Sequence, residues 1–354
     1  MTETLTWPAI LGRLLDKTDL DRPAAAWAMN QIMAGEAADA QVGAFMIGLR
    51  SKGESVEELA GLVDVMLERS VILDTGDDAV DIVGTGGDMV GTVNVSSMAS
   101  ILTAAAGVPV MKHGSRSASG KTGSSEMLEV LGIRLDLSPE RVADIFREIG
   151  LTFFFAPVFH PAMRHVAPIR KQLGVPTTFN FLGPLANPAQ PIATSLGVAN
   201  RSVAPLMAAE LAARGRSALV FRGDDGLDEL TTTDNSQIWQ VAGGEVREFT
   251  LDPRKFDIAR ADHSQLLGGD AHFNAQVCRD LFDGNTDGNL GAVRDIVVLN
   301  SAAGVVAYDL AKDNSRADVD LDLRFEAAIE RVSAALDSGA ARGKLTEWIA
   351  TTQL

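Results

Sequence analysis

The chain has 354 residues, 46% of them hydrophobic and 22% charged, which is enough for a large buried core and two lobes. Its formal net charge of −16 argues against binding to nucleic acid or to an anionic membrane surface. The single cysteine, Cys278, excludes an internal disulfide, and we expect no membrane span and no signal peptide, so we predict a cytoplasmic protein.

Residues 1–72 are predicted to form an all-helical lobe. Ser55 and Glu58 have the spacing of a capping box, and alanine-rich helices are expected at 23–33 and 37–49. Apolar residues follow the capping box at helical spacing: Val56, Leu59, Val63 and Met66. With no strand to pack on, this lobe must bury its apolar faces on the next lobe or on a second subunit.

A strand–loop–helix pattern begins near residue 80. The strand residues Val80, Ile82 and Val83 lead into the glycine-rich sequence GTGGD (84–88). Small polar residues then gather at the start of a helix through Ile101 and Ala105, namely Thr92, Asn94, Ser96 and Ser97. One or two of them could cap that helix, but four exceed what a cap needs and fit a site for a polyanion and a metal.

A second loop of this kind follows a strand at 108–111. It runs from Lys112 to Ser125 and contains Arg116 and Lys121 among serines and glycines, although it could also be a solvated basic loop. It matches neither a Walker A loop nor GxGxxG. Two anion cradles about 30 residues apart, joined by a strand–helix–strand unit, suit a ligand with two phosphate groups.

Strands and helices alternate through the rest of the chain. A helix is predicted to start at Ser138-Pro139, and strands are expected at 151–155, 217–221 and 237–241. This alternation indicates an α/β lobe with a mostly parallel sheet, which binds ligands beyond the carboxyl ends of its strands.

Asp228 and Glu229 follow the strand at 217–221 and form a candidate Mg²⁺ site at the cleft surface, although such a pair could also be plain solvated surface. His160 and His165 lack a third ligand nearby, so zinc is not favoured. No serine-nucleophile elbow occurs.

Taken in order, these segments resemble the anthranilate phosphoribosyltransferase family over nearly the whole chain. The carrying motifs are GTGGD (84–88), TVNVSS (92–97), KHGSRSASGKTGSSEMLEVLG (112–132), FAPVFHPAMRHVAPIRKQLG (155–174), FNFLGPLANPA (179–189) and GLDEL (226–230). Any one motif would be weak, whereas the set in this order is specific.

The resemblance implies a small all-helical N-terminal lobe (1–72) and a large α/β lobe (73–354) like that of nucleoside phosphorylases and phosphoribosyltransferases. It implies that segment 160–190 packs on or hinges to the helical lobe, and that two chains form a homodimer through their helical lobes. The implied reaction is magnesium-dependent transfer of the 5-phosphoribosyl group from phosphoribosyl diphosphate to the amine of anthranilate, in tryptophan biosynthesis.

The family's site residues carry over by position. Lys112, Asp228 and Glu229 would stabilise charge in catalysis, with no general base assigned, and Ser96, Asp228 and Glu229 would hold the metal. The residues implied to bind phosphoribosyl diphosphate are Gly84, Gly87, Asp88, Thr92, Asn94, Val95, Ser96, Ser97, Lys112, His113, Gly114, Ser115, Arg116, Ser117, Ala118, Ser119, Gly120 and Ser124. Those implied to bind anthranilate are Gly84, His113, Ser115, Pro157, Met163, Ala167 and Arg170.

Three positions depart from the family pattern. Ser115 stands where the family has an asparagine of the acceptor site, Gly120 replaces the second residue of a serine pair, and Ser97 replaces a threonine. Because of the Ser115 change, a second hypothesis is that the chain is a related phosphoribosyltransferase that uses another aromatic acceptor. Two further hypotheses are a catalytically silent family member that binds nucleic acid or serves as a scaffold, and a pyrimidine nucleoside phosphorylase. The intact Lys112 and acidic pair oppose the scaffold, and the motifs at 155–174 and 226–230 oppose the phosphorylase.

Overall fold

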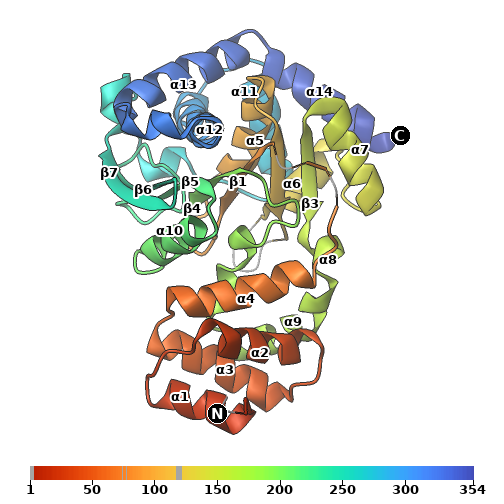
Figure 1. Ribbon diagram of the computed structural model, residues 1–354. Helices are drawn as coiled ribbons and strands as arrows, with labels where there is room; N and C mark the ends of the chain where they lie inside the picture. The colour runs from red at the N-terminus through yellow and green to blue at the C-terminus, as the bar shows by residue number, and fades with distance from the viewer. Residues whose placement is uncertain (1–3, 74, 77, 117–121) are drawn as a thin grey trace.

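The structure is a computed structural model that describes residues 4–73, 75–76, 78–116 and 122–354. Figure 1 shows a small helical lobe below a larger α/β lobe. The predicted fold class, a helical lobe followed by an α/β lobe with a mostly parallel sheet, is confirmed. The helical lobe consists of α1 (Trp7–Leu15), α2 (Arg22–Met33), α3 (Asp39–Lys52) and α4 (Val56–Glu68).

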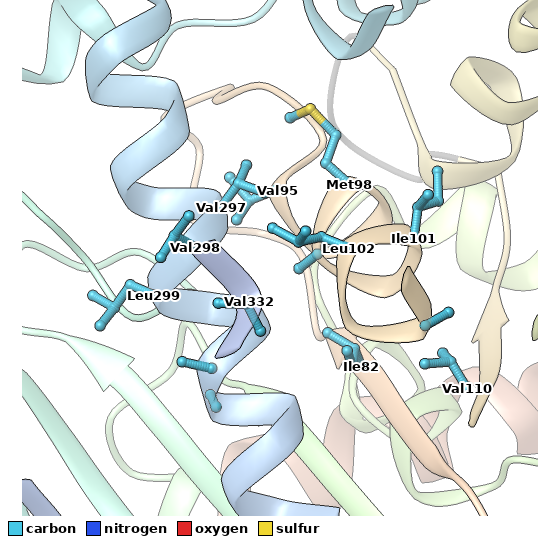
Figure 2. Packing of buried hydrophobic residues seen from close by; sticks show 14 of the residues in the cluster. Ile82, Val95, Met98, Ile101, Leu102, Val110, Val297, Val298, Leu299 and Val332 are labelled. Carbon is cyan, nitrogen blue, oxygen red and sulfur yellow. The ribbon is translucent and has the colours of Figure 1, made fainter. Parts of the chain in front are cut away.

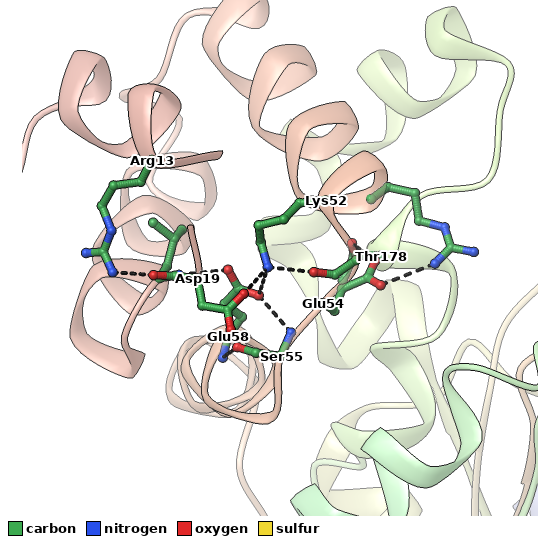
Figure 3. Close-up of polar contacts among 10 residues, drawn as sticks. Arg13, Asp19, Lys52, Glu54, Ser55, Glu58 and Thr178 are labelled. Carbon is green, nitrogen blue, oxygen red and sulfur yellow. Dashed lines mark hydrogen bonds and ion pairs between the residues drawn. The ribbon is translucent and has the colours of Figure 1, made fainter. Parts of the chain in front are cut away.

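The predicted capping box begins α4. Ser55 Oγ accepts a hydrogen bond from Glu58 N (3.3 Å), and Glu58 Oε2 accepts one from Ser55 N (2.7 Å). Glu58 also contacts Lys52 Nζ at 3.0 Å, inside the polar network of Figure 3. The first turn of α4 is therefore tied to the end of α3.

The α/β lobe is built on one seven-stranded sheet in the order β3-β2-β1-β4-β5-β6-β7. Neighbours from β3 to β5 run parallel, while β6 and β7 form an antiparallel edge. The strands are β1 (Val80–Gly84), β2 (Val110–Gly114), β3 (Leu151–Phe155), β4 (Ala193–Gly197), β5 (Ser217–Gly223), β6 (Ser236–Ala242) and β7 (Glu245–Leu251). The three later strands that the sequence predicts are all present.

One face of the sheet is covered by a cluster of buried side chains from α5 (Val95–Ala105) and α12 (Leu290–Lys312). Figure 2 shows Leu102 and Val298 in this cluster, with Ile82 of β1 below them. The remaining helices of this lobe are α6 (Ser124–Leu131), α7 (Pro139–Ile149), α8 (Ala156–Phe159), α9 (Ala167–Leu173), α10 (Ala204–Ala213), α11 (Ala271–Phe282), α13 (Leu321–Asp337) and α14 (Ala340–Gln353). Short 3₁₀ turns occur at Pro161–His165, Thr178–Asn180, Gly183–Leu185, Pro253–Phe256, His263–Gln265 and Asn314–Asp318.

By length and composition alone, α12 is long and apolar enough to cross a membrane, although the sequence led us to expect no such span. Its most apolar window is 72% buried inside the protein. Burial of that extent is what a core helix shows, and in this sheet α12 lies across β4 and β5.

The opposite face of the sheet continues into the helical lobe. A second buried cluster joins Phe45 and Leu62 of the helical lobe to Leu196 of β4 and Met207 of α10. The helical lobe thus buries apolar surface on its neighbouring lobe within one chain, one of the two solutions that the sequence allowed.

The chain between β3 and β4 also returns to the helical lobe. There α9 packs against α3, and Ile169 is part of the shared apolar cluster. Thr178 Oγ1 donates a 2.6 Å hydrogen bond to Glu54 Oε1 of the helical lobe, and both residues are buried. The bond is among the contacts drawn in Figure 3.

Candidate active site

The loops that follow β1, β2 and β5 meet at the carboxyl ends of these strands. Gly86 N, after β1, donates a 2.6 Å hydrogen bond to Asp228 Oδ2, after β5. Asn94 Nδ2, at the start of α5, donates to Thr122 O in the second glycine-rich loop at 3.3 Å. Three segments far apart in the sequence therefore form one site at the sheet edge where α/β proteins bind ligands.

Glycine makes the close approach of the acidic segment possible. A Cβ on Gly84 would lie 2.3 Å from Asp228 Oδ2, and one on Gly197 would lie 1.7 Å from Asp228 O. Gly87, in the turn that follows, has φ +86°. The GTGGD loop is thus shaped to seat Asp228, and its Asp88 carboxylate accepts from Val90 N at 3.2 Å.

The acidic pair is more enclosed than the sequence predicts. Asp228 is only 8% exposed, whereas the sequence predicts an open cleft surface. It can lie this deep because Gly84 and Gly197 have no side chains to collide with it. Glu229 is half-buried. Burial, reinforced by the charge of Asp88, raises the pKa of Asp228 to about 7. Burial and the neighbouring Asp228 charge raise the pKa of Glu229 well above its usual range. Lys112 is the cation that opposes this rise for Glu229, and it does not offset it, so the pair is short of positive charge.

A divalent cation bound beside Asp228 and Glu229 would supply the missing positive charge. The described residues contain no group of three or more His, Cys, Asp or Glu side chains placed to hold a metal. Mg²⁺ typically takes one or two carboxylates and completes its shell with substrate phosphates and water. Asp228 and Glu229 suit this arrangement, in which the substrate supplies the remaining oxygens.

Lys112 lies within β2 rather than in the loop after it. Its side chain is 2% exposed, and Nζ donates to Ile82 O at 2.6 Å and to Ser96 Oγ at 3.2 Å. Burial lowers its pKa, and the charges of Asp81, Glu229 and Asp228 oppose that shift. Lys112 is therefore a buried cation beneath the loops that orients the Ser96 hydroxyl.

The small polar residues at the start of α5 differ in their partners. Asn94 is the N-cap residue, yet its side chain makes no capping bond and accepts instead from Asn274 Nδ2 at 2.8 Å. Ser97 Oγ is buried and has no hydrogen-bond partner within the described residues. Thr92 forms a bridge with Leu267. The side chain of Val95 points into the core (Figure 2), which leaves only its backbone for a ligand.

The second loop is described on both sides of residues 117–121. Gly114 ends β2, Ser115 and Arg116 are exposed, and Ser124 Oγ donates to Ser115 O at 3.3 Å. Arg116 pairs with Glu129 at 3.0 Å, so it faces α6 here. The predicted donor-binding residues Ser117, Ala118, Ser119 and Gly120, together with Lys121, lie outside the described residues.

Two histidines in tilted ring contact adjoin the strand ends. The His113 and His160 rings are 5.1 Å apart, and burial lowers their pKa values to about 3 and about 4. A carbonyl only accepts, so His113 Nδ1 donates to Gly183 O (3.1 Å) and His160 Nε2 to Ala186 O (2.9 Å). His113 Nε2 is left buried with no partner among the described residues and carries a free lone pair.

Four of the predicted acceptor residues lie on the segment that returns to the helical lobe. Pro157 is in α8, Met163 is in the following 3₁₀ turn, and Ala167 and Arg170 are in α9. The Arg170 guanidinium has no ion pair or hydrogen bond in the part of the chain that is described, and burial lowers its pKa. No polar contact within those residues joins it to the strand-end loops.

Several polar residues of the site were not anticipated from the sequence. Asn274 connects α11 to Asn94 and accepts from Gly269 N at 2.9 Å. Asn300 of α12 accepts from Leu230 N and donates to Leu230 O, both at 2.9 Å, which fixes the chain just after Glu229. Asp81 and Asn187 bridge β1 and β2.

Comparison with known protein families accounts for both lobes. Residues 8–70 match the helical bundle domain of a glycosyl transferase family, and residues 76–342 match the a/b domain of that family. The two matches follow the two lobes of the structure.

Full-length relatives point to one activity. The chain is 51% identical over 353 residues to anthranilate phosphoribosyltransferase of Leifsonia xyli, covering 100% of both chains. It superposes on the crystal structure of anthranilate phosphoribosyltransferase from Thermus thermophilus with a TM-score of 0.87 and 36% identity, covering 98% of this chain and 99% of that one. The enzyme from Saccharomyces cerevisiae in complex with PRPP and Mg gives a TM-score of 0.86 at 25% identity, with 98% of each chain covered.

Proposed function

This chain belongs to the anthranilate phosphoribosyltransferase family, and we propose that it transfers the 5-phosphoribosyl group of phosphoribosyl diphosphate to the amine of anthranilate. The products are N-(5-phosphoribosyl)anthranilate and diphosphate, in tryptophan biosynthesis. The observation that carries the proposal is the meeting of two glycine-rich loops with an acidic pair whose Asp228 is buried.

The donor has an anionic group at each end, and the site has two anion cradles. The GTGGD loop and the start of α5 offer backbone N–H groups, the Ser96 hydroxyl and the unpartnered Ser97 hydroxyl. The second loop adds its own N–H groups and the hydroxyl of Ser124. We assign the phosphoribosyl diphosphate contacts to these two loops, as the family motifs imply.

Mg²⁺ would be held by Asp228 and Glu229, with Ser96 nearby, and when bound it supplies counter-charge to the leaving diphosphate. The protein's own contribution is to keep these two carboxylates fixed and poorly solvated. Gly86 N and the Asn300 clamp on Leu230 hold the segment on both sides of the pair.

We assign the acceptor to the space bounded by His113 and Arg170. An unpaired, desolvated guanidinium is suited to a carboxylate such as that of anthranilate. The Nε2 lone pair of His113 can accept a hydrogen bond from an aromatic amine. Pro157, Met163 and Ala167 supply apolar surface along the same segment.

In the reaction the amine nitrogen forms a bond to the anomeric carbon while the bond from that carbon to the diphosphate oxygen breaks. The oxygen keeps the bonding electron pair, and the amine afterwards releases one proton. Burial lowers the pKa of His113 to about 3, which makes it a poor proton acceptor at neutral pH, so we assign it no role as a general base. Orientation of the two substrates and neutralisation of diphosphate therefore account for the catalysis.

The test is a fluorescence assay. We expect anthranilate fluorescence to decrease when the protein is mixed with phosphoribosyl diphosphate and Mg²⁺, because anthranilate is consumed. We expect no decrease in fluorescence without Mg²⁺ or without the donor. A protein that binds the donor but leaves anthranilate fluorescence unchanged would contradict the assignment. The hypothesis of another aromatic acceptor rests on Ser115 alone, and the full-length relatives do not favour it.

Two further assignments complete the proposal. We propose a homodimer joined through the helical lobes, where Leu15 of α1 and Ile47 of α3 are exposed apolar residues. A monomer mass from light scattering at micromolar concentration would contradict it. We also propose a cytoplasmic location, to which the buried, unpaired Cys278 is suited.

A further inference from the structure

The two strands that carry the glycine-rich loops are barely joined by backbone pairing. β1 and β4 are in register at five positions from Val80 to Gly84, whereas β1 and β2 are in register only at Val80 and Val110. The donor loops begin beyond this point on both strands. Backbone pairing therefore does not determine the distance between the two loops.

Side-chain hydrogen bonds take the place of the backbone pairing that β1 and β2 lack beyond Val80. Asp81 Oδ1 accepts from His113 N (3.1 Å), and Asn187 Nδ2 donates to Met111 O (2.8 Å). Lys112 Nζ donates to Ile82 O (2.6 Å). Three backbone groups beyond the single paired position are thus each satisfied by a side chain.

Two of these side chains also bind each other. Asn187 Nδ2 donates to Asp81 Oδ2 at 2.9 Å, and Asn187 Oδ1 accepts from Ala189 N at 3.0 Å. Asp81 is 0% exposed and Asn187 5% exposed, so neither side chain has surface available for a ligand. The pair is a buried wedge between the roots of the two loops, with every polar atom of Asn187 in use.

We propose that the Asp81–Asn187 pair sets the distance between the two glycine-rich loops, so that both anionic ends of one phosphoribosyl diphosphate molecule are bound at once. Both are positioning residues, since neither faces the ligand. The proposal rests on the proposed function only in its choice of donor. It adds that affinity for the donor depends on loop spacing as well as on the groups within each loop.

Fragments of the donor test this directly. Ribose 5-phosphate and diphosphate with Mg²⁺ each carry one anionic end, so their binding is independent of the spacing between loops. Asp81→Asn replaces the oxygen that accepts from Asn187 with a second NH₂ group, and Asn187→Leu removes the wedge's hydrogen bonds at similar volume. By calorimetry we expect both variants to bind the intact donor about tenfold more weakly and each fragment within about twofold of the parent protein. The KM for anthranilate should stay within about twofold.

A matched control variant distinguishes an effect of loop spacing on donor affinity from an effect of lower protein stability. Thr152→Val in β3 also removes a buried hydrogen bond to backbone, from Thr152 Oγ1 to Val142 O at 3.1 Å, on the strand next to β2. We expect it to lower the melting temperature without changing donor affinity. If Asn187→Leu does not fold, Asp81→Asn alone carries the test.

Donor affinity unchanged in Asp81→Asn, or donor and both fragments weakened together, would overturn the proposal. Failure of the proposed function is distinguishable, because it appears in the parent protein as donor binding without consumption of anthranilate.

Discussion

Two clusters of buried charge show how differently this chain uses ionised side chains. In the helical lobe, Lys52 donates to Asp19 Oδ1 (2.5 Å) and Glu58 Oε2 (3.0 Å), and Glu58 Oε1 accepts from Leu20 N (Figure 3). Burial opposes ionisation of Lys52, but hydrogen bonds to Asp19 and Glu58 raise its pKa. Lys52 has two carboxylate partners, of which Asp19 is largely exposed, and the buried Glu58 has Lys52 as its cation.

At the strand ends the balance is different. Burial and then the charge of Asp88 raise the pKa of Asp228, and burial and then the charge of Asp228 raise that of Glu229. Lys112, the buried cation beneath them, has its pKa lowered by burial and also lies beside Asp81. The first cluster is complete without a ligand, whereas the second is short of positive charge, which is typical of a functional site.

The largest expected effect comes from removing the charge of the acidic pair. Asp228→Asn combined with Glu229→Gln keeps the volume that the glycines accommodate, so we expect the fold to persist. The rate of transfer should fall at least about a thousandfold, because diphosphate would leave without counter-charge. Steady-state kinetics across a range of Mg²⁺ concentrations measures this. Near-normal turnover at limiting Mg²⁺ would show that the metal lies elsewhere.

The same pair makes stability depend on pH in the absence of metal. Asp228 has a pKa of about 7 in the folded protein, above its unfolded value of about 3.9, so the folded state holds the proton more tightly. Its contribution to stability is therefore fully present below about pH 4 and is lost as pH rises toward 7.

We expect Asp228→Asn to raise the Mg²⁺-free melting temperature relative to the parent protein at pH 7.5 and to have less effect at pH 5. Mg²⁺ should reduce that difference at pH 7.5 by stabilising only the parent. Scanning calorimetry of both proteins at the two pH values provides the measurement. An equal difference at both pH values would mean that Asp228 is ionised throughout.

In the helical-lobe cluster we expect a substitution to lower stability and to leave the reaction rate unchanged, the reverse of the result expected for the acidic pair. Lys52→Met leaves the buried Glu58 without its cation, and we expect the free energy of unfolding to fall by about 3 kcal/mol. The kcat of the folded protein should be unchanged. Lys312→Met, which removes an exposed pair with Asp78, is the matched control and should cost less than about 1 kcal/mol. Urea unfolding with parallel kinetics separates the two effects.

The sequence was informative where local pattern determines structure. The Ser55–Glu58 capping box and β3 at Leu151–Phe155 are as predicted, since caps and apolar runs act over a few residues. It was less informative about β2, where Lys112 and His113 read as loop residues but lie within a strand. Their polar groups are satisfied by partners on other strands, and periodicity does not reveal such partners.

The polar residues that complete the site were missed for a related reason. Asn187 binds Asp81 across 106 residues of chain, and Asn274 binds Asn94 across 180. A single asparagine carries no spacing signal of its own, whether it lies in a loop, as Asn187 does, or in a helix, as Asn274 does. Only the fold brings these side chains to the strand ends.

The smallest expected effect concerns Ser115, where the chain departs from the family's asparagine. Ser115 is exposed after β2, and its carbonyl accepts from Ser124 Oγ at 3.3 Å, so its side chain is not committed to the fold. Asparagine offers both a donor and an acceptor and reaches further than a serine hydroxyl. If anthranilate binds beside His113, Ser115→Asn should add one hydrogen bond, worth about 1 kcal/mol, and lower the KM for anthranilate roughly fivefold.

Ser115 belongs to neither charge cluster, so Ser115→Asn should leave donor binding and stability unchanged. Donor binding depends on backbone groups, Lys112 and the acidic pair, none of which Ser115→Asn alters, so the KM for phosphoribosyl diphosphate should stay within about twofold. Stability should also be nearly unchanged, because the site is exposed. Initial rates with each substrate varied in turn provide the measurement. An unchanged or higher KM for anthranilate would place Ser115 outside the acceptor site or match it to another aromatic amine. Substituted anthranilates would then distinguish the two, because only a matched acceptor would have a lower KM with Ser115 than with asparagine.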